Sequence, residues 1–178
     1  MRQNSCCFTG HRAVSGADAA ALRPALRAEI GRLAEKGVTE FYAGGARGFD
    51  MLAEETVLEM RKTLPVRLHL ILPCRDQDTK WPQNLRVRFD AILKAADSVR
   101  YITDEYDESC MRLRNDALVE AAACCVCYMQ RKSGGTAYTV NQARRAGLEI
   151  IHLLTMEPEQ MTLDSSLSAA FGGAEENN

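Results

Sequence analysis

A glycine-rich stretch, residues 44–50, most constrains what this chain can fold into. The apolar run 38–42 before it is typical of a strand, and residues 51–62 after it have the apolar spacing of a helix. Glycines let the backbone approach a ligand closely, and the first N–H groups of a helix have no partner inside it. A strand, a glycine turn and a helix in this order therefore predict a phosphate-binding loop. Asp50 could be the N-cap of this helix or could accept a hydrogen bond from a ribose hydroxyl. The alternative for the whole stretch is a tight turn between strand and helix, with Asp50 as the cap and no ligand.

The rest of the chain alternates between strand-like and helical segments. The expected strands cover residues 5–8, 38–42, 66–72, 98–102, 123–129 and 149–154. The expected helices cover residues 17–36, with Pro24 in the first turns, and then 51–62, 84–95, 110–121 and 137–146. This alternation predicts an α/β fold with a mainly parallel sheet that is covered on both faces. We expect one domain over residues 1–156 and a poorly ordered C-terminal extension over residues 157–178.

Three of the expected loops carry residue types that bind anions. Residues 9–12 combine a hydroxyl, a glycine, an imidazole and a guanidinium, residues 44–50 form the first glycine loop, and residues 133–136 open a later helix. Right-handed crossovers place all such loops at the carboxyl edge of a parallel sheet, where ligands bind. The three loops together predict a phosphate pocket. The candidate ligand-binding residues are Thr9, Gly10, His11, Arg12, Gly44, Gly45, Ala46, Gly48, Asp50, Trp81, Arg114, Asn115, Gly134, Gly135 and Thr136.

Several of these candidates have a second interpretation. His11 could take part in catalysis, or it could be a loop hydrogen-bonder or a surface histidine. Trp81 is the only tryptophan, and it could stack on a nucleotide base or pack as a lid on the core. Arg114 and Asn115 could face the pocket or the solvent.

The charge balance and the cysteines narrow the class of partner. The chain has 22 Lys and Arg against 24 Asp and Glu, a formal net charge of −2 at pH 7, with 6% aromatic residues. This balance argues against a nucleic-acid partner, which needs a basic surface. Seven cysteines without metal-ligand spacing predict reduced buried thiols and no structural metal, and nothing in the sequence calls for a cofactor. The sequence shows no signal peptide or membrane span, so we expect a cytoplasmic protein, and a homo-oligomer is compatible with it.

The motif residues resemble those of a known group of proteins. The segments 9–12, 44–50 and 134–136, together with Trp81 and residues 114–115, resemble the SLOG superfamily of Rossmann-like proteins, which includes the Smf/DprA and LOG-type proteins. The YpsA-like branch is the most similar, and the resemblance spans roughly residues 5–154. It implies a Rossmann-like three-layer sandwich with a pocket for a nucleotide or nucleotide-derived ligand.

One position departs from the LOG pattern and shapes the functional hypotheses. Aligning residues 135–136 with the Gly-Thr of the LOG motif places Thr139 where its catalytic glutamate stands, and a threonine cannot serve as that acid or base at neutral pH. The first hypothesis is therefore binding or sensing of a nucleotide ligand. The alternative is a nucleotide N-glycosidic (phosphoribo)hydrolase in which Asp50, Glu54 or His11 replaces the glutamate. Single-stranded DNA binding is a third hypothesis, which the charge balance disfavours.

Overall fold

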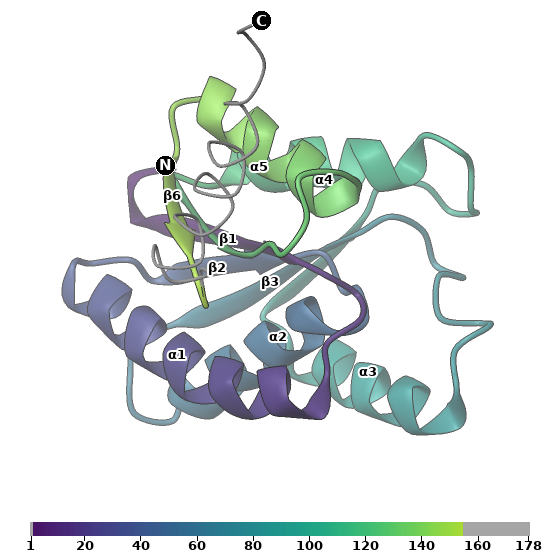
Figure 1. Cartoon of the computed structure of the whole chain (residues 1–178). Coiled ribbons are helices and arrows are strands. Elements are labelled where there is room, and N and C mark those ends of the chain that lie inside the picture. The colour runs from purple at the N-terminus through teal and green to yellow at the C-terminus, as the bar shows by residue number, and fades with distance from the viewer. Residues whose placement is uncertain (1, 155–178) are drawn as a thin grey trace, which may run out of the picture.

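The computed structural model describes residues 2–154, which form a six-stranded parallel sheet with helices on both faces (Figure 1). The predicted C-terminal extension, residues 157–178, lies outside the described residues. The strands are β1 (Ser5–Gly10), β2 (Glu40–Ala43), β3 (Arg67–Leu72), β4 (Ser98–Tyr101), β5 (Cys124–Tyr128) and β6 (Glu149–His152), in the sheet order β4-β3-β2-β1-β5-β6. The helices are η1 (Arg2–Asn4), α1 (Gly16–Glu35), α2 (Phe49–Met60), α3 (Gln83–Ala95), α4 (Cys110–Ala121) and α5 (Gly135–Arg145).

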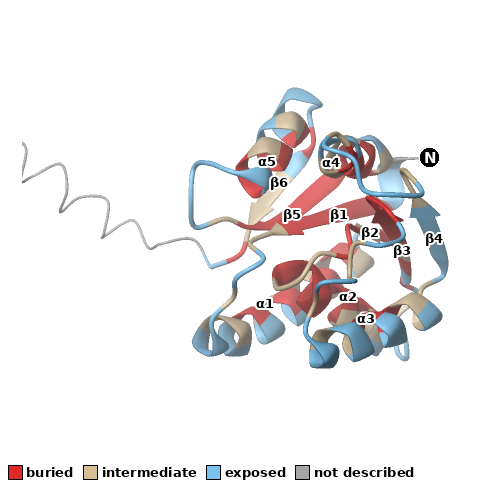
Figure 2. Ribbon diagram, turned by 90° about the vertical axis from the view of Figure 1, so that its right-hand side faces the viewer, coloured by how far each residue is buried: buried red, intermediate tan, exposed pale blue. Residues whose placement is uncertain are grey.

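The helices form two outer layers around the sheet. Helices α1, α2 and α3 cover one face, and α4 and α5 cover the other (Figures 1 and 2). All five strand pairs are parallel, in agreement with the predicted mainly parallel sheet. The expected Rossmann-like three-layer α/β fold is thus confirmed.

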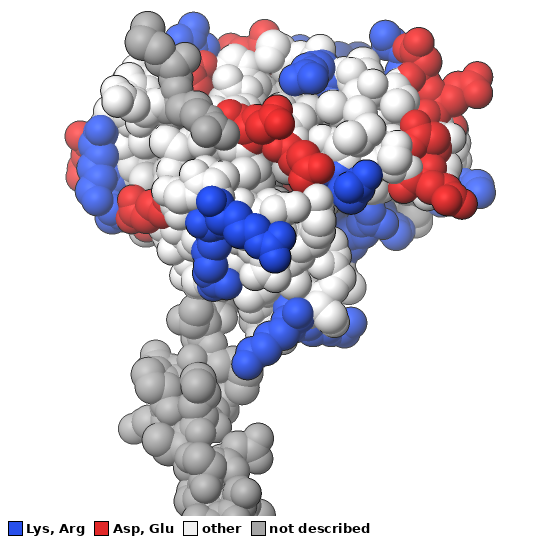
Figure 3. Space-filling view, turned by 90° about the horizontal axis from the view of Figure 1, so that it is seen from above, with Lys and Arg blue, Asp and Glu red and all other residues white. Residues whose placement is uncertain are grey.

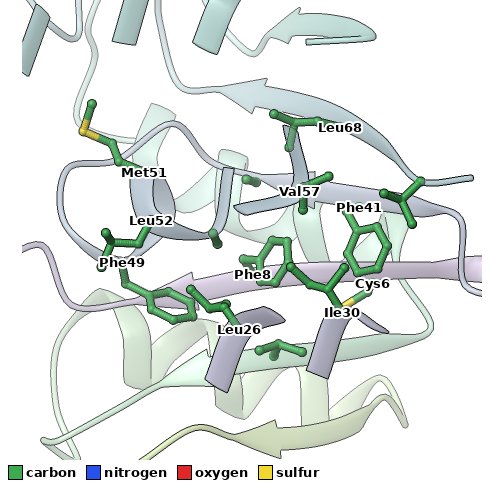
Figure 4. Close-up of a cluster of buried hydrophobic side chains, with 14 of the residues drawn as sticks. Cys6, Phe8, Leu26, Ile30, Phe41, Phe49, Met51, Leu52, Val57 and Leu68 are labelled. Atoms are coloured by element: carbon green, nitrogen blue, oxygen red, sulfur yellow. The ribbon is translucent and has the colours of Figure 1, made fainter. Parts of the chain in front are cut away.

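The central strands are apolar on both sides because each side faces a helical layer. In β1, Cys6 and Phe8 point into the core beneath α1 and α2, while Cys7 points toward α4 and α5. Phe8 stacks on Phe41 of the neighbouring strand, with ring centroids 5.7 Å apart, and meets the Phe49 ring edge-on at 6.4 Å. Figure 4 shows these rings among the aliphatic side chains of the first core. All seven cysteines are buried free thiols, as predicted.

Helix α1 differs from its prediction in the position of Pro24. The helix begins at Gly16, where the Ser15 hydroxyl caps it by accepting from the Asp18 N–H at 3.0 Å. Pro24 therefore lies in the helix interior and not in the first turns. A proline there removes one backbone hydrogen bond. The helix persists because its other side buries Leu22, Leu26, Ile30 and Leu33, while Pro24 faces the solvent.

The order of the strands creates a switch point beside β1. The chain adds β2, β3 and β4 on one side of β1, and then returns to add β5 and β6 on the other side. The loops that follow β1 and β5 consequently lead to helices on opposite faces of the sheet. Such a divergence at the carboxyl edge leaves a crevice in which ligands of this fold class bind.

Candidate functional site

A cleft of about 380 Å³ lies at this switch point. The loops after β1, β2 and β5 and the body of α4 contribute its walls. Sequence analysis predicted most of the residues that line it, namely Thr9, Gly10, His11, Arg12, Ala46, Asp50, Arg114, Asn115, Gly135 and Thr136. Phe8, Met111 and Leu118 complete the lining and were not predicted, because nothing distinguishes them from core residues in the sequence.

Five predicted residues do not line the cleft. Three of them, Gly44, Gly45 and Gly48, leave room for neighbouring segments to pack closely. A Cβ atom on Gly45, at φ +66°, would lie 2.3 Å from Leu72, so this residue faces the core. A Cβ atom on Gly48, at φ +79°, would lie 2.4 Å from the Arg12 carbonyl oxygen, so this residue lets two loops meet. A Cβ atom on Gly44 would collide with the Arg114 side chain. The remaining two residues are Gly134 and Trp81, which are described below.

Two carboxyl side chains of α2 and one arginine of α4 form hydrogen bonds with the backbone of the first glycine loop. Glu54 Oε1 accepts from the Gly45 N–H at 2.9 Å, and Asp50 Oδ2 accepts from the Ala46 N–H at 3.4 Å. The Arg114 guanidinium donates to the Gly44 carbonyl oxygen. These two loop N–H groups are therefore occupied by carboxyl groups of the protein. The sequence suggested that this loop would contact a phosphate directly, but these two N–H groups donate to the protein instead.

Asp50 lines the cleft and does not cap α2. The N-cap is Gly48, and Asp50 is the second residue of the helix, so the predicted capping role is wrong. The physical reason is that the positive φ of Gly48 allows a tight entry, after which the Asp50 side chain turns back to the Ala46 N–H. Burial raises the pKa of Asp50, against the opposing effect of the Arg114 charge and the loop N–H groups. Asp50 is thus a buried carboxyl group with one side on the cleft.

Glu54 follows Asp50 by one helical turn, so both carboxyl groups lie on one face of α2. Glu54 is fully buried and does not line the cleft. Burial, and then the neighbouring Asp50, raise its pKa well above the usual range of a glutamate. Its Oε2 has no hydrogen-bond partner among the described residues. Glu54 therefore supports the glycine loop but cannot reach a ligand in the cleft.

Two arginines bring positive charge to the cleft. Arg114 is only 5% exposed, and its Nε donates to Asn115 Oδ1 at 2.8 Å, so both residues face the cleft and not the solvent. Arg12 is exposed, and its Nη2 contacts Met111 Sδ at 3.6 Å. Within residues 2–154, no carboxylate forms an ion pair with Arg12. The cleft lining thus contains two guanidinium groups and, among the described residues, one carboxyl group, that of Asp50, so its charge balance favours anions.

His11 joins the two loops that diverge at the switch point. Its Nε2 accepts from the Gln130 N–H at 2.8 Å, and its ring meets the Tyr128 ring edge-on at 5.8 Å. Burial and the Arg131 charge lower the pKa of His11, which favours the neutral imidazole needed to accept this hydrogen bond. The loop hydrogen-bonding interpretation of His11 is thus confirmed, and the residue also lines the cleft.

The N-terminus of α5 opens onto the cleft. Gly134 is the N-cap with φ +90°, and Gly135 and Thr136 form the first turn, whose N–H groups have no partner inside the helix. Thr139 is fully buried, and its hydroxyl donates to the Gly135 carbonyl oxygen at 2.9 Å. It neither faces the cleft nor offers a titratable group.

Trp81 lies in the loop between β3 and α3, beside the cleft. Its ring packs against Phe89 with centroids 5.2 Å apart, and the Arg47 guanidinium lies 5.9 Å from its centroid. Trp81 packs on the core, as the second interpretation predicted, and it also lines two cavities beside the cleft. Stacking on a nucleotide base stays a prediction. Sequence analysis missed Tyr106 in one of these cavities, because it stands in an acidic loop without a motif.

Over residues 2–154, no group of three or more His, Cys, Asp or Glu side chains could hold a metal ion. The same residues contain no helix that is long and apolar enough to cross a membrane.

Comparisons with known sequences identify the family. A family model described as the YspA SLOG family, YpsA, matches residues 7–159. The chain belongs to the YpsA-like SLOG family. A UPF0398 protein of Halalkalibacterium halodurans is 30% identical over 128 residues, which cover 70% of this chain and 68% of that protein. A UPF0398 protein of Bacillus thuringiensis is 28% identical over 130 residues, which cover 71% of each.

Solved structures with similar folds include two DNA-processing proteins. DNA processing protein A from Streptococcus pneumoniae has a TM-score of 0.63 and 15% identity, and the match covers 95% of this chain but 56% of that one. The Helicobacter pylori protein, described by its single-stranded DNA binding mode, has a TM-score of 0.63, 16% identity and coverages of 91% and 72%. The molybdenum cofactor carrier protein of Chlamydomonas reinhardtii has a TM-score of 0.55, 17% identity and coverages of 95% and 87%. At these identities the likeness shows a shared fold.

Proposed function

We propose that this protein binds or senses a nucleotide or nucleotide-derived ligand, whose phosphate lies in the cleft at the switch point. The observation that carries the proposal is the exposed guanidinium of Arg12, which has no carboxylate partner among the described residues and lines the same cleft as the first turn of α5. A guanidinium presents paired donors that match the oxygens of a phosphate. The unpaired N–H groups of a helix N-terminus add to this attraction.

The remaining polar groups of the cleft suit the same ligand. The hydroxyl groups of Thr9 and Thr136 can donate to phosphate oxygens, and the Asp50 carboxyl group can accept from a ribose hydroxyl. The charges of Arg114 and Arg12 both act on the Asp50 carboxyl group, and Arg12 is the exposed one of these two arginines. Family membership agrees with a small-molecule site at this edge but does not select the ligand.

The proposal can be tested with Arg12→Gln, which removes the charge while keeping most of the side chain. We expect this variant to bind AMP or ADP at least about tenfold more weakly than the parent in isothermal titration calorimetry, a loss of about 1.4 kcal/mol. Arg145→Gln is a matched control, because it removes the same charge at the far end of α5 on an exposed position. Equal affinities of the parent and the Arg12 variant, or binding of neither nucleotide by the parent, would refute the proposal.

A second candidate function is hydrolysis of a nucleotide N-glycosidic bond, and Asp50 is the observation that favours it. Asp50 is the one acidic residue of the cleft lining within the described part of the chain, and its pKa is raised by burial toward a range useful for proton transfer. Liquid chromatography of nucleoside monophosphates incubated with the protein would detect released base. Asp50→Asn preserves an acceptor for the Ala46 N–H and should abolish any release. Release that survives in Asp50→Asn would exclude this mechanism.

Single-stranded DNA is a third candidate because of the structural likeness to DNA processing protein A. The charge distribution supports it less than a nucleotide. On the face seen in Figure 3, Lys and Arg side chains lie in separate groups with acidic and uncharged residues between them. A strand-binding groove needs continuous basic surface. Fluorescence anisotropy with a labelled oligothymidylate at low salt would reveal such binding.

A further inference from the structure

A second cavity beside the cleft combines two aromatic rings with an arginine side chain. It encloses about 470 Å³ and is lined by Trp81, Tyr106, Arg47, Gln77 and Met111 among others, a set called the aromatic cavity below. Its volume lies within the usual range for small-molecule sites. It opens between the loop after β3 and the loop after β4, further along the edge of the sheet than the cleft.

The Trp81 ring is held in place before any ligand arrives. Phe89 of α3 packs against it with a tilt of 55° between the rings. The backbone of the residue is fixed as well, because the Trp81 main-chain N–H donates to the Asp78 carbonyl oxygen at 2.9 Å. Pro82 follows directly and is the N-cap of α3. The ring is thus positioned by the core on one side while it lines the cavity on the other. A fixed ring loses little conformational entropy when it stacks on a ligand.

Tyr106 supplies a second ring to the same cavity. Its exposed fraction of 60% is the highest of any large hydrophobic residue in the described part of the chain. The Arg47 guanidinium lies near the Trp81 ring and lines the same cavity. Gln77 donates to the Gly45 carbonyl oxygen at 3.2 Å, which connects the cavity floor to the glycine loop. Two rings, a cation and an amide are the groups that recognise a flat heterocycle carrying polar edges.

A third, smaller cavity shares lining residues with both the aromatic cavity and the cleft. It encloses about 80 Å³, and its lining includes three arginines, Arg12, Arg47 and Arg114. It shares Arg12 and Arg114 with the cleft, and Arg47 and Trp81 with the aromatic cavity. The shared residues place an anion site, an arginine-lined cavity and an aromatic site next to one another. A nucleotide has the matching order of phosphate, linker and base.

We infer that the aromatic cavity is a base-stacking subsite, in which Trp81 and Tyr106 hold the base of a nucleotide whose phosphate lies in the cleft. This inference rests on the proposed function, and it adds the orientation of the ligand and the residues that determine its affinity. Stacking tolerates different bases because every base has a π face, so the subsite accepts both purine and pyrimidine nucleotides.

The experiment compares a nucleotide with ribose 5-phosphate, which has the phosphate and sugar but no base. Tyr106→Ala should weaken ADP binding at least about fivefold, because base stacking on an aromatic side chain contributes at least that much. It should leave the affinity for ribose 5-phosphate unchanged, and Tyr106→Phe should restore ADP binding. Val87→Ala, which truncates a 57% exposed side chain on α3, is the control. Arg12→Gln should weaken both ligands.

A spectroscopic readout tests the stacking directly, because Trp81 is the only tryptophan of the chain. ADP should quench the tryptophan fluorescence of the parent, and ribose 5-phosphate should not. If ADP binds with parental affinity to Tyr106→Ala and without quenching, the subsite is refuted while the phosphate cleft stands. If the parent binds neither ligand, the proposed function fails and this inference fails with it. Quenching by an oligonucleotide but not by ADP would overturn the inference in favour of nucleic acid.

Discussion

Replacing Glu54 by glutamine should remove a pH-dependent cost of folding. The Glu54 carboxyl group is fully buried, its Oε1 accepts from the Gly45 N–H, and its Oε2 lacks a partner among the described residues. Burial and Asp50 raise its pKa well above that of a free glutamate. The folded protein therefore keeps this proton over a pH range in which the unfolded chain has already released it.

The sign and the size of the effect follow from proton linkage. Between the unfolded pKa of about 4.3 and the raised folded pKa, the folded state binds more protons at this site, so the free energy of unfolding falls as pH rises. One group can produce a slope of at most about 1.4 kcal/mol per pH unit. Glu54→Gln retains the acceptor for Gly45 but cannot ionise. It should lie closest to the parent below about pH 4.3, and it should become progressively more stable than the parent as pH rises toward the raised pKa of Glu54.

Urea unfolding followed by circular dichroism at pH 5, 6, 7 and 8 measures this difference. Asp50 has a raised pKa in both proteins, so its contribution cancels to first order when the two profiles are subtracted. Glu59→Gln is the matched control, because it makes the same change on the same helix where the side chain is 49% exposed. Parallel stability profiles for the parent and Glu54→Gln would show that Glu54 is ionised in the fold, and the reasoning would be wrong.

Two further predictions concern the loops. Gly45→Ala should destabilise the fold by about 2–4 kcal/mol, since alanine at positive φ and a Cβ atom 2.3 Å from Leu72 both cost free energy. Gly135→Ala places its Cβ atom no closer than 4.0 Å to the Asn115 side chain, so it should change the free energy of unfolding by less than about 1 kcal/mol. Equal losses of unfolding free energy for the two variants in guanidinium would contradict this contrast. Protonation of His11 should release the Gln130 N–H as pH falls below about 6.5 through the lowered pKa of His11. Hydrogen exchange of the Gln130 amide, corrected for its intrinsic rate, should therefore show less protection at pH 5 than at pH 7. Equal protection at both pH values would contradict a hydrogen bond between His11 and Gln130 that protonation breaks.

The alternation of apolar runs and glycine turns determined the fold class. Residues 6–8 and 124–128 are apolar at successive positions, which is typical of strands covered on both faces, and they lie in the adjacent strands β1 and β5. The turns at residues 9–12 and 133–136 followed these strands in the sequence. Their meeting at one edge could be predicted because right-handed crossovers place the carboxyl ends of parallel strands together. The residues of the cleft that belong to these two turns were accordingly found from the sequence.

The first glycine loop shows where such prediction stops. Its residues have the composition of a phosphate loop, yet two of its N–H groups point to Asp50 and Glu54. The direction of a backbone N–H group depends on φ and ψ and on the side chains behind it, and here Glu54 comes from the next turn of α2. A motif specifies which residues are present and not which way their donors face.

The sequence by itself determined the alternating strands and helices, the carboxyl-edge position of the loops, and the small and charged residues available there, because these depend on local periodicity and on the handedness of the chain. Only the tertiary structure decided which of those residues share a cavity. Trp81 and Tyr106 are 25 positions apart, counted from their residue numbers, and line one cavity from two loops of unrelated composition. Arg114 turned inward because Gly44 leaves room for its guanidinium. Such contacts depend on how whole elements pack, and no short stretch of sequence contains that information.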